Sequence, residues 1–263
     1  MCRLSFLIVA IVLLLSCGPK PEPGIIPPAK GSPKAISAEL KTLEESVLSG
    51  AQSVSIAISK PGFGKQSLSG NIFYQNDRYY FKAEATLGKD VAKVMIKDGR
   101  TTAYSPIDNA YYRERSNEHK DQWGISIEEI LSLIMGKYGF EKGEISYVGM
   151  VEGFYFYKVV TEDYIKKLTV RPETINITGI RYEPRKRFGD KDVVDVSFAD
   201  FREYLDGYRP ERVVISIRED NITIEIKINS EKLNQQLPDE IFTLELPDDA
   251  QEVSPYWFWE IEF

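Results

Sequence analysis

The chain has 263 residues, with 33 Lys and Arg against 40 Asp and Glu, and its formal net charge at pH 7 is −7. This acidic balance argues against nucleic-acid binding, because binding to phosphates depends on neutralisation by cationic side chains. Both cysteines lie before residue 18, so no disulfide can form within the remainder and a packed core must stabilise it. The chain is long enough for such a core in one large domain or two small ones.

An apolar run over residues 4–15 follows the single cation Arg3. The run is long enough for the apolar part of an export signal and too short to span a bilayer. No later apolar run approaches the length of a transmembrane helix. We therefore predict a signal peptide over residues 1–16.

Cys17 ends this region, with Leu14 three residues before it, the small Ser16 directly before it and Gly18 directly after it. This pattern resembles the lipobox of bacterial lipoproteins, although Leu15 is bulkier than the family usually places there. The resemblance implies cleavage after Ser16, a diacylglyceryl thioether on Cys17 and acylation of the new amino group. The alternative is an ordinary signal peptide with an incidental cysteine.

Residues 17–34 change abruptly in composition, because six prolines are spaced among glycines and lysines. Proline fixes φ and removes a backbone donor, so the segment favours extended polyproline conformations that reach roughly 3.1 Å per residue, or about 50 Å in all. We predict a tether that holds a folded domain away from the membrane. A ligand for a proline-recognition domain is the alternative.

The folded domain is predicted to begin with an amphipathic helix. Ile36, Leu40, Leu43 and Val47 recur at intervals of three and four residues, with charged residues between them, so one face is suited to burial. Gly50 stands where such a helix would end.

After residue 50 the hydrophobic period changes from near 3.6 to 2, which predicts a series of strands joined by short turns. A second helix interrupts the series, since Ser126 and Glu129 have the spacing of a capping box and an apolar run follows, ending near Gly136. The predicted strands cover residues 53–59, 66–74, 79–85, 91–96, 101–104, 110–113, 145–150, 154–160, 165–170, 174–182, 193–198, 213–217 and 222–228.

Residues 222–228 show the alternation most clearly, with isoleucine at every second position and polar residues between. This is the pattern of a half-buried strand in an antiparallel sheet. Consecutive strands with short connections favour one continuous sheet, so we predict a mainly β (α+β) domain over residues 35–255 and a separate tail over residues 256–263.

The order of these elements resembles the Lol-type lipoprotein localisation factors, a periplasmic carrier and an outer-membrane acceptor. The matching segments are Gly70-Asn71-Ile72, Arg78-Tyr79-Tyr80-Phe81-Lys82-Ala83-Glu84, Leu87-Gly88, Asp98-Gly99 and Phe242-Thr243-Leu244-Glu245-Leu246-Pro247. The resemblance implies a single strongly curved antiparallel sheet, a half-open β-barrel whose concave face is covered by the N-terminal and mid-chain helices. It also implies an apolar cavity for acyl chains, and a membrane-insertion loop at Leu87 and Gly88. The alternative for Leu87 is an ordinary apolar residue in a hairpin.

A curved sheet with few helices has a concave apolar face that the helices cover only in part, which favours a cavity. Periodicity cannot distinguish a filled interior from an empty one, so the same residues are also ordinary core candidates. The predicted lining residues are Phe81, Val94, Ile96, Phe156, Val194, Val196, Ile224 and Ile226.

Few residues suit catalysis or metal binding. The sole histidine, His119, lies in a polar stretch, and it has no histidine or cysteine companion for a zinc site. We predict no enzyme activity, no cofactor and no metal, although two carboxylates acting as a glycosidase remain open. The acidic pairs at 239–240 and 248–249 could hold a weak calcium ion, but solvated turns are the simpler interpretation.

Two further segments are candidates for binding a partner. Basic residues gather around Pro184, among them Arg185, Lys186 and Arg187, which could contact lipid phosphates or an acidic protein or form a solvated loop. The C-terminal tail, with Trp257 and Trp259, is unusually aromatic and could pack on the domain, plug its cavity or bind a partner as a strand.

The functional hypothesis is a lipid-anchored carrier or acceptor that binds the acyl chains of lipids or lipoproteins. The alternatives are a scaffold of an envelope complex, with a filled barrel and a protein partner, and an uncharacterised hydrolase. Gly18 follows Cys17 where aspartate commonly retains lipoproteins in the inner membrane, so we expect anchoring in the outer membrane, facing the periplasm.

Overall fold

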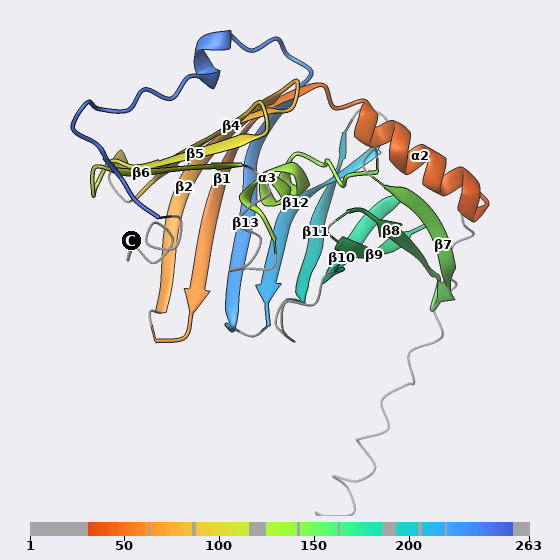
Figure 1. The fold of residues 1–263 in the computed structure, drawn as a ribbon. Helices are drawn as coiled ribbons and strands as arrows, with labels where there is room; N and C mark the ends of the chain where they lie inside the picture. Colours follow the sequence, from red (N-terminus) through yellow and green to blue (C-terminus); the bar gives the residue numbers. More distant parts are fainter. Residues whose placement is uncertain are drawn as a thin grey trace, which may run out of the picture.

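The computed structural model describes residues 31–62, 64–85, 88–115, 125–140, 143–162, 164–185, 193–204, 207–218 and 220–254. These residues form one strongly curved, open sheet with two α-helices, which confirms the predicted half-open barrel (Figure 1). No helix among them is long and apolar enough to cross a bilayer.

All fourteen strands of the described residues belong to one sheet, in the order β14-β6-β5-β4-β3-β2-β1-β13-β12-β11-β10-β9-β8-β7. Neighbouring strands are antiparallel except β14 and β6, which are parallel. The strands are β1 Ser49–Lys60, β2 Gly64–Gln75, β3 Arg78–Glu84, β4 Asp90–Lys97, β5 Arg100–Ser105, β6 Ala110–Arg115, β7 Glu144–Val151, β8 Phe154–Val160, β9 Tyr164–Arg171, β10 Asn176–Pro184, β11 Val194–Tyr204, β12 Gly207–Ile217, β13 Ile222–Leu233 and β14 Gln251–Glu252.

The topology explains why a helix covers the concave face. The strands from β1 to β6 run outward in one direction, and those from β7 to β13 return from the opposite edge until β13 pairs with β1. The connection from β6 to β7 must therefore cross the opening of the half-barrel. It contains α3, Ile127–Ile134, which lies inside the curve of the sheet in Figure 1.

Helix α2, Pro33–Glu45, begins two residues before the predicted start of the folded domain at residue 35. The Ser32 side chain caps it by accepting a hydrogen bond from the Ala35 N–H at 3.3 Å, and Pro33 occupies the first turn, where no N–H is needed. The expected end at Gly50 is wrong, because the helix stops at Glu45 and Gly50 already belongs to β1. The helix cannot continue to Gly50, because the chain enters β1 at Ser49 and β1 forms backbone hydrogen bonds with β2 and β13.

Helix α3 confirms its predicted start and end. The Ser126 hydroxyl accepts a hydrogen bond from the Glu129 N–H at 3.2 Å, and Gly136 follows the helix with a φ of +75°. A Cβ at Gly136 would collide with the Arg209 guanidinium, so both backbone conformation and space require glycine there.

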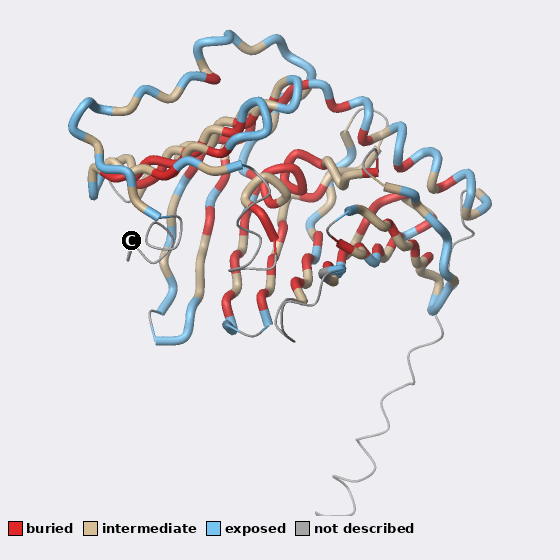
Figure 2. Tube along the Cα trace, in the orientation of Figure 1, coloured by how far each residue is buried: buried red, intermediate tan, exposed pale blue. Residues whose placement is uncertain are grey.

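The core lies on the concave side of the sheet, where inward residues of the strands meet both helices (Figure 2). Ile222, Ile224, Ile226 and Ile228 of β13 are all buried, as the alternation predicted. Across the β1–β13 pair Ile226 is matched with Ile56, so apolar residues from strands far apart in sequence share one face.

Several strands are longer than their hydrophobic patterns indicated. Strand β11 runs on to Tyr204 and β12 begins at Gly207, although alternation was evident only over residues 193–198 and 213–217. The added residues of β11 after Phe198 are mostly exposed or half-buried. Ladder hydrogen bonds extend these strands beyond the covered face, where no apolar pattern is required.

Candidate functional site

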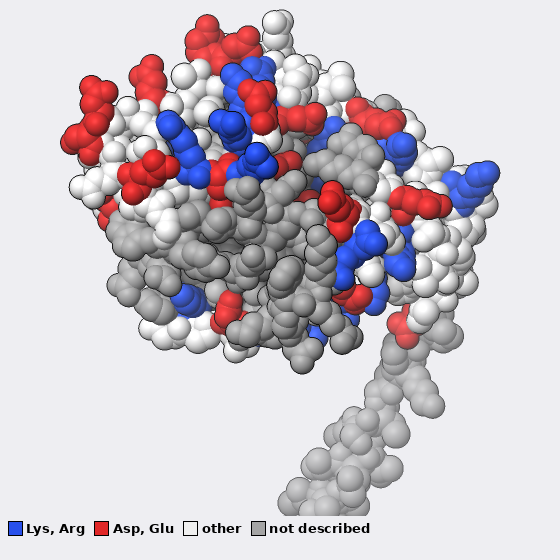
Figure 3. All heavy atoms as spheres, viewed as in Figure 1, with Lys and Arg blue, Asp and Glu red and all other residues white. Residues whose placement is uncertain are grey.

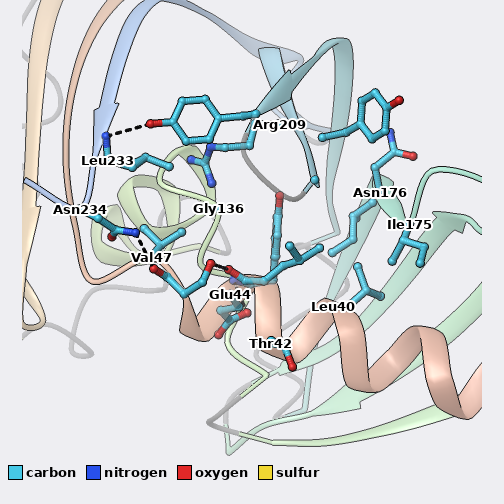
Figure 4. A pocket seen from close by; sticks show the side chains of 17 residues that line it. Leu40, Thr42, Glu44, Val47, Gly136, Ile175, Asn176, Arg209, Leu233 and Asn234 are labelled. Carbon is cyan, nitrogen blue, oxygen red and sulfur yellow. Dashed lines mark hydrogen bonds between the residues drawn. The ribbon is translucent and has the colours of Figure 1, made fainter.

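A cavity of about 250 Å³ lies between the C-terminal half of α2 and the ends of β10 to β13 (Figure 4). Its apolar wall comes mainly from Leu40 and Leu43 of α2, from Val47 two residues beyond the end of that helix, and from Ile175 and Ile177 on and beside β10. The remaining lining residues are Thr42, Glu44, Ser46, Gly136, Tyr138, Asn176, Tyr204, Gly207, Tyr208, Arg209, Leu233 and Asn234.

The amphipathic face of α2 forms one side of this cavity. Leu40 and Val47 are nearly fully buried, while Leu43, between them, is half-buried and packs where a side chain at Gly207 would stand. The helical spacing places Leu40 and Leu43 on this side of α2. Val47 joins the same wall from the link between α2 and β1.

A buried carboxylate fastens α2 to the segment that follows α3. Glu44, only 3% exposed, accepts hydrogen bonds from the backbone N–H groups of Tyr138 at 2.8 Å, Gly139 at 3.1 Å and Phe140 at 3.1 Å. Three donors on one carboxylate compensate for its removal from water. Glu44 was expected only as a polar residue between apolar ones, and its position within the helix gave no sign of this role.

A buried ion pair supports the opposite wall. The Arg209 guanidinium donates to the Glu231 carboxylate at 2.7 and 2.8 Å, and also to the Met135 carbonyl at 3.0 Å. Gln52 of β1 donates both to Glu231 and to the Ile134 carbonyl. These contacts join β12, β13 and β1 to the C-terminal end of α3.

A third polar cluster holds the first turn of α3 against the sheet. The Lys166 ammonium of β9 donates to Glu129 and to the Tyr138 carbonyl, and the Tyr182 hydroxyl donates to Glu129 at 3.0 Å. Burial, with the nearby Glu129 charge, raises the pKa of Tyr182 well above its ordinary value. The hydroxyl therefore stays protonated and remains a donor.

Polar groups close the cavity near the end of α2. The Asn234 amide donates to the Ser46 carbonyl at 2.9 Å and accepts from the Leu48 N–H at 2.9 Å. The Leu233 N–H donates to the Tyr204 hydroxyl at 3.4 Å, as Figure 4 shows. The cavity thus has an apolar interior and a hydrogen-bonded margin.

The predicted lining residues divide into three groups. Phe81 is half-buried and packs against the core, and Phe156 is half-buried on the face of β8 opposite the buried Tyr155 and Tyr157. The cavity beneath α2 has other lining residues, and a ligand role for the predicted set stays a prediction. The buried group, each member at most 5% exposed and in one packed cluster, comprises Val94, Ile96, Val194, Val196, Ile224 and Ile226.

The predicted partner and membrane sites fall mostly outside the described residues. This applies to Cys17, Leu87, Lys186, Arg187, Trp257 and Trp259. Gly88 is described and has a φ of +72°. Arg185 is exposed, and its guanidinium donates to the Thr161 carbonyl at 3.0 Å.

The described part of the chain contains no group of three His, Cys, Asp or Glu side chains that could hold a metal ion. Of the acidic pairs, Asp239 forms an ion pair with Arg78 at 2.8 Å. His119 lies outside the described residues.

No protein-family model matches the sequence, and the search of curated proteins found no match. Solved structures do resemble the fold. An outer-membrane lipoprotein-sorting protein domain from Vibrio parahaemolyticus has a TM-score of 0.60 at 12% identity, over 79% of this chain and 94% of that chain. A LolA superfamily protein from Nitrosomonas europaea has a TM-score of 0.59 at 14% identity, over 80% and 97% of the two chains.

A DUF1329 family protein from Desulfovibrio piger has a TM-score of 0.61 at 12% identity, over 80% of this chain and 95% of that chain. At such identities the comparison shows the architecture alone. The order of the elements along the chain, the curvature of the sheet and the positions of the two helices (Figure 1) agree with the resemblance to the Lol-type factors seen in the sequence. The described residues therefore form a domain with the Lol-type fold.

Proposed function

We propose that this chain is a lipid-anchored envelope lipoprotein that binds acyl chains of lipids or lipoproteins, and that it acts as a carrier or acceptor. The observation that carries the proposal is the apolar cavity between α2 and the sheet. The Lol-type fold supports the same class of ligand, because the similar structures include a lipoprotein-sorting domain. Acylation of Cys17, anchoring in the outer membrane and exposure to the periplasm belong to the proposal.

The size of the cavity indicates how a ligand would enter. Its volume of about 250 Å³ is below the roughly 300–1,000 Å³ of typical small-molecule sites. A long acyl chain therefore requires α2 to move away from β10 to β13. The apolar contacts of Leu40, Leu43 and Val47 would then be replaced by contacts with the acyl chain. The three hydrogen bonds to the Glu44 carboxylate oppose this movement, so the ligand must supply the free energy that opens the cavity.

We propose that the protein works by binding and not by catalysis. The polar side chains around the cavity are engaged in holding elements together: Glu44 with three N–H groups, and Arg209 with Glu231. These charged side chains hold helices and strands together. Among the described residues that line the cavity, no nucleophile lies beside a base that could activate it.

A scaffold of an envelope complex is the second candidate. It is favoured by the filled interior of the barrel, where the inward residues of β4, β11 and β13 pack in one cluster. In that case the fold would serve as a rigid platform and the cavity beneath α2 would stay closed.

The discriminating experiment measures lipid binding directly. Protein purified in mild detergent is analysed by mass spectrometry for retained lipid, and the delipidated chain is then titrated with a fluorescent long-chain fatty acid. We expect saturable binding at micromolar concentration. If the delipidated chain does not bind the fatty acid, the result would favour the scaffold.

A matched pair of substitutions locates the ligand. Leu43→Trp fills the cavity from α2 and is expected to weaken fatty-acid binding at least about tenfold, because the added ring occupies space an acyl chain needs. Leu48→Trp makes the same chemical change at a side chain that is 66% exposed, and should leave binding unchanged. Equal affinities in both variants would place the ligand elsewhere.

A further inference from the structure

Strand β7 forms one edge of the sheet and exposes apolar side chains on both faces of that edge, because Met150 is paired with the buried Tyr155 and Val151 with Phe154 on the opposite face of β8. Tyr147, Val148, Met150 and Val151 are 45%, 65%, 61% and 60% exposed, and they are four of the eight residues of the strand. Figure 3 shows mostly uncharged atoms at the edge of the molecule where Figure 1 draws β7. Apolar side chains concentrated in this way commonly mark a contact surface.

The shape of this edge disfavours the addition of another strand. Tyr147 pairs with Tyr157 and Gly149 pairs with Phe156, so Val148 has no partner position and forms a bulge. A bulge bends and twists the edge, and proteins use this device against edge-to-edge pairing. Apolar contacts have no preferred direction, so an apolar surface can cover these side chains without the aligned hydrogen bonds that another strand would need.

The N-terminal segment joins the fold beside this edge. The Tyr157 hydroxyl of β8 donates to the carbonyl of Pro33, the first residue of α2, at 2.8 Å. The Tyr147 ring of β7 packs against the Tyr157 ring, with centroids 5.6 Å apart. The chain between Cys17 and Gly31 can span at most about 45 Å at polyproline extension. A lipid on Cys17 would therefore leave the start of α2, and β7 beside it, at most about 45 Å from the membrane, which is near enough for β7 to reach its surface.

We propose that Tyr147, Val148, Met150 and Val151 dock β7 onto the surface of the bilayer that holds the anchor, at the boundary between headgroups and acyl chains. Apolar and aromatic side chains suit this boundary, where Tyr places its ring among acyl chains and its hydroxyl in the headgroup layer. The docking rests on the lipid anchor at Cys17 that the proposed function includes.

The charges next to the patch specify the kind of surface. Glu144 begins β7 and Glu152 follows it, and both side chains are exposed. Carboxylates at both ends of the strand are repelled by anionic headgroups. A zwitterionic phosphatidylcholine surface is therefore expected to bind the patch at least as well as one that contains phosphatidylglycerol.

The test uses the complete lipidated chain in phosphatidylcholine vesicles, with a fluorophore on a single introduced thiol. Val151→Cys places the environment-sensitive label in the patch, and Leu48→Cys places it at a control position that is 66% exposed and follows the other end of α2. We expect a blue shift and quenching by spin-labelled lipid at position 151 and neither at position 48. Adding Val148→Ser and Met150→Ser should reduce quenching at position 151 about fivefold or more.

Three results would overturn the docking. The first is a chain that floats with the vesicles but gives equal quenching at positions 151 and 48. The second is a blue shift at position 151 that needs no vesicles and grows with protein concentration, since this would mark contact between copies. The third is a chain that does not float with vesicles, because it lacks the anchor. Fatty-acid titration needs no vesicles, so failure of the cavity proposal is distinguished from each of these.

Discussion

Arg209 and Glu231 form a buried ion pair in which two nitrogens of the guanidinium face the two carboxylate oxygens at 2.7 and 2.8 Å. Their side chains are 15% and 3% exposed. Because Arg209 also donates to the Met135 carbonyl, the pair connects the sheet to the end of α3. The wall of the cavity beneath α2 depends on this connection.

Removal of one partner should therefore be costly. Arg209→Met leaves Glu231 as a buried charge without its cation, and we expect the free energy of unfolding to fall by about 3 kcal/mol. Urea denaturation followed by circular dichroism measures this loss. Arg202→Met is the control, since Arg202 pairs with Glu211 at the surface and its loss should cost less than about 1 kcal/mol. Equal losses in the two variants would contradict a special role for Arg209.

The Glu44 carboxylate provides a second test. Glu44→Gln keeps the shape of the side chain but removes its charge, so we expect a loss of about 2 kcal/mol in unfolding free energy. Hydrogen exchange of the Tyr138 and Phe140 amides should accelerate at the same time. Glu45→Gln, one residue along and 57% exposed, should change stability by less than about 0.5 kcal/mol. Unaltered exchange in Glu44→Gln would show that α2 is fastened by other contacts.

Movement of α2 can be tested with a reversible cross-link. The Leu43 side chain lies 3.1 Å from the point where a Cβ on Gly207 would stand, so Leu43→Cys with Gly207→Cys places two thiols within reach. Oxidation should fix α2 against β12 and reduce fatty-acid affinity at least about tenfold. Reduction of the same sample should restore binding. Ligand that binds the oxidised form as well would mean that α2 stays in place.

Alkaline pH should destabilise the fold through its buried tyrosines. Burial raises the pKa of Tyr138 from its ordinary 10.0 to about 12, and also raises the pKa values of Tyr79, Tyr157 and Tyr182. The unfolded chain loses these protons first, so stability is complete below pH 10 and falls as pH rises toward 12. Urea denaturation at pH 8 and pH 11 measures the difference.

Tyr138→Phe is the control for this pH effect. The variant has no proton to lose at position 138, so it should lose about 1 kcal/mol less stability than the parent chain between pH 8 and pH 11. An identical pH dependence in both chains would assign the alkaline loss to the other tyrosines.

Local patterns predicted much of the fold. Alternation over residues 222–228, the Ser126 cap and Gly136 all agree with the structure, because each follows from the geometry of one short segment. Gly50 was wrongly predicted as the end of the first helix. A glycine after an apolar helical pattern can also belong to a strand, and here it lies in β1, which is paired with β2 on one side and with β13 on the other. The extra lengths of β11 and β12 were missed because exposed ladder positions need no apolar pattern.

The cavity was not predictable in the same way. The Lol-type resemblance and the curvature suggested an apolar interior, but inward residues such as Val194 and Ile226 pack against one another. The space lies beneath α2, where Leu43 faces residues of β12 that are more than 160 positions away. Sequence periodicity identifies which face of a helix or strand a residue occupies. It does not indicate whether side chains from the element packed against that face fill the space between the two elements.

The sequence by itself indicated the two helices and thirteen of the fourteen described strands along the chain, since these depend on local period and caps. Its composition also predicts a proline-rich tether before an acidic domain. The order of the strands within the sheet, and the short β14, came from the tertiary structure. Only the tertiary structure decided which polar groups became buried partners, such as Glu44 with the N–H of Phe140. It also decided that β7 became an edge and that Tyr157 brought the start of α2 beside it. These are contacts between distant segments, and their energies depend on burial that no single segment specifies.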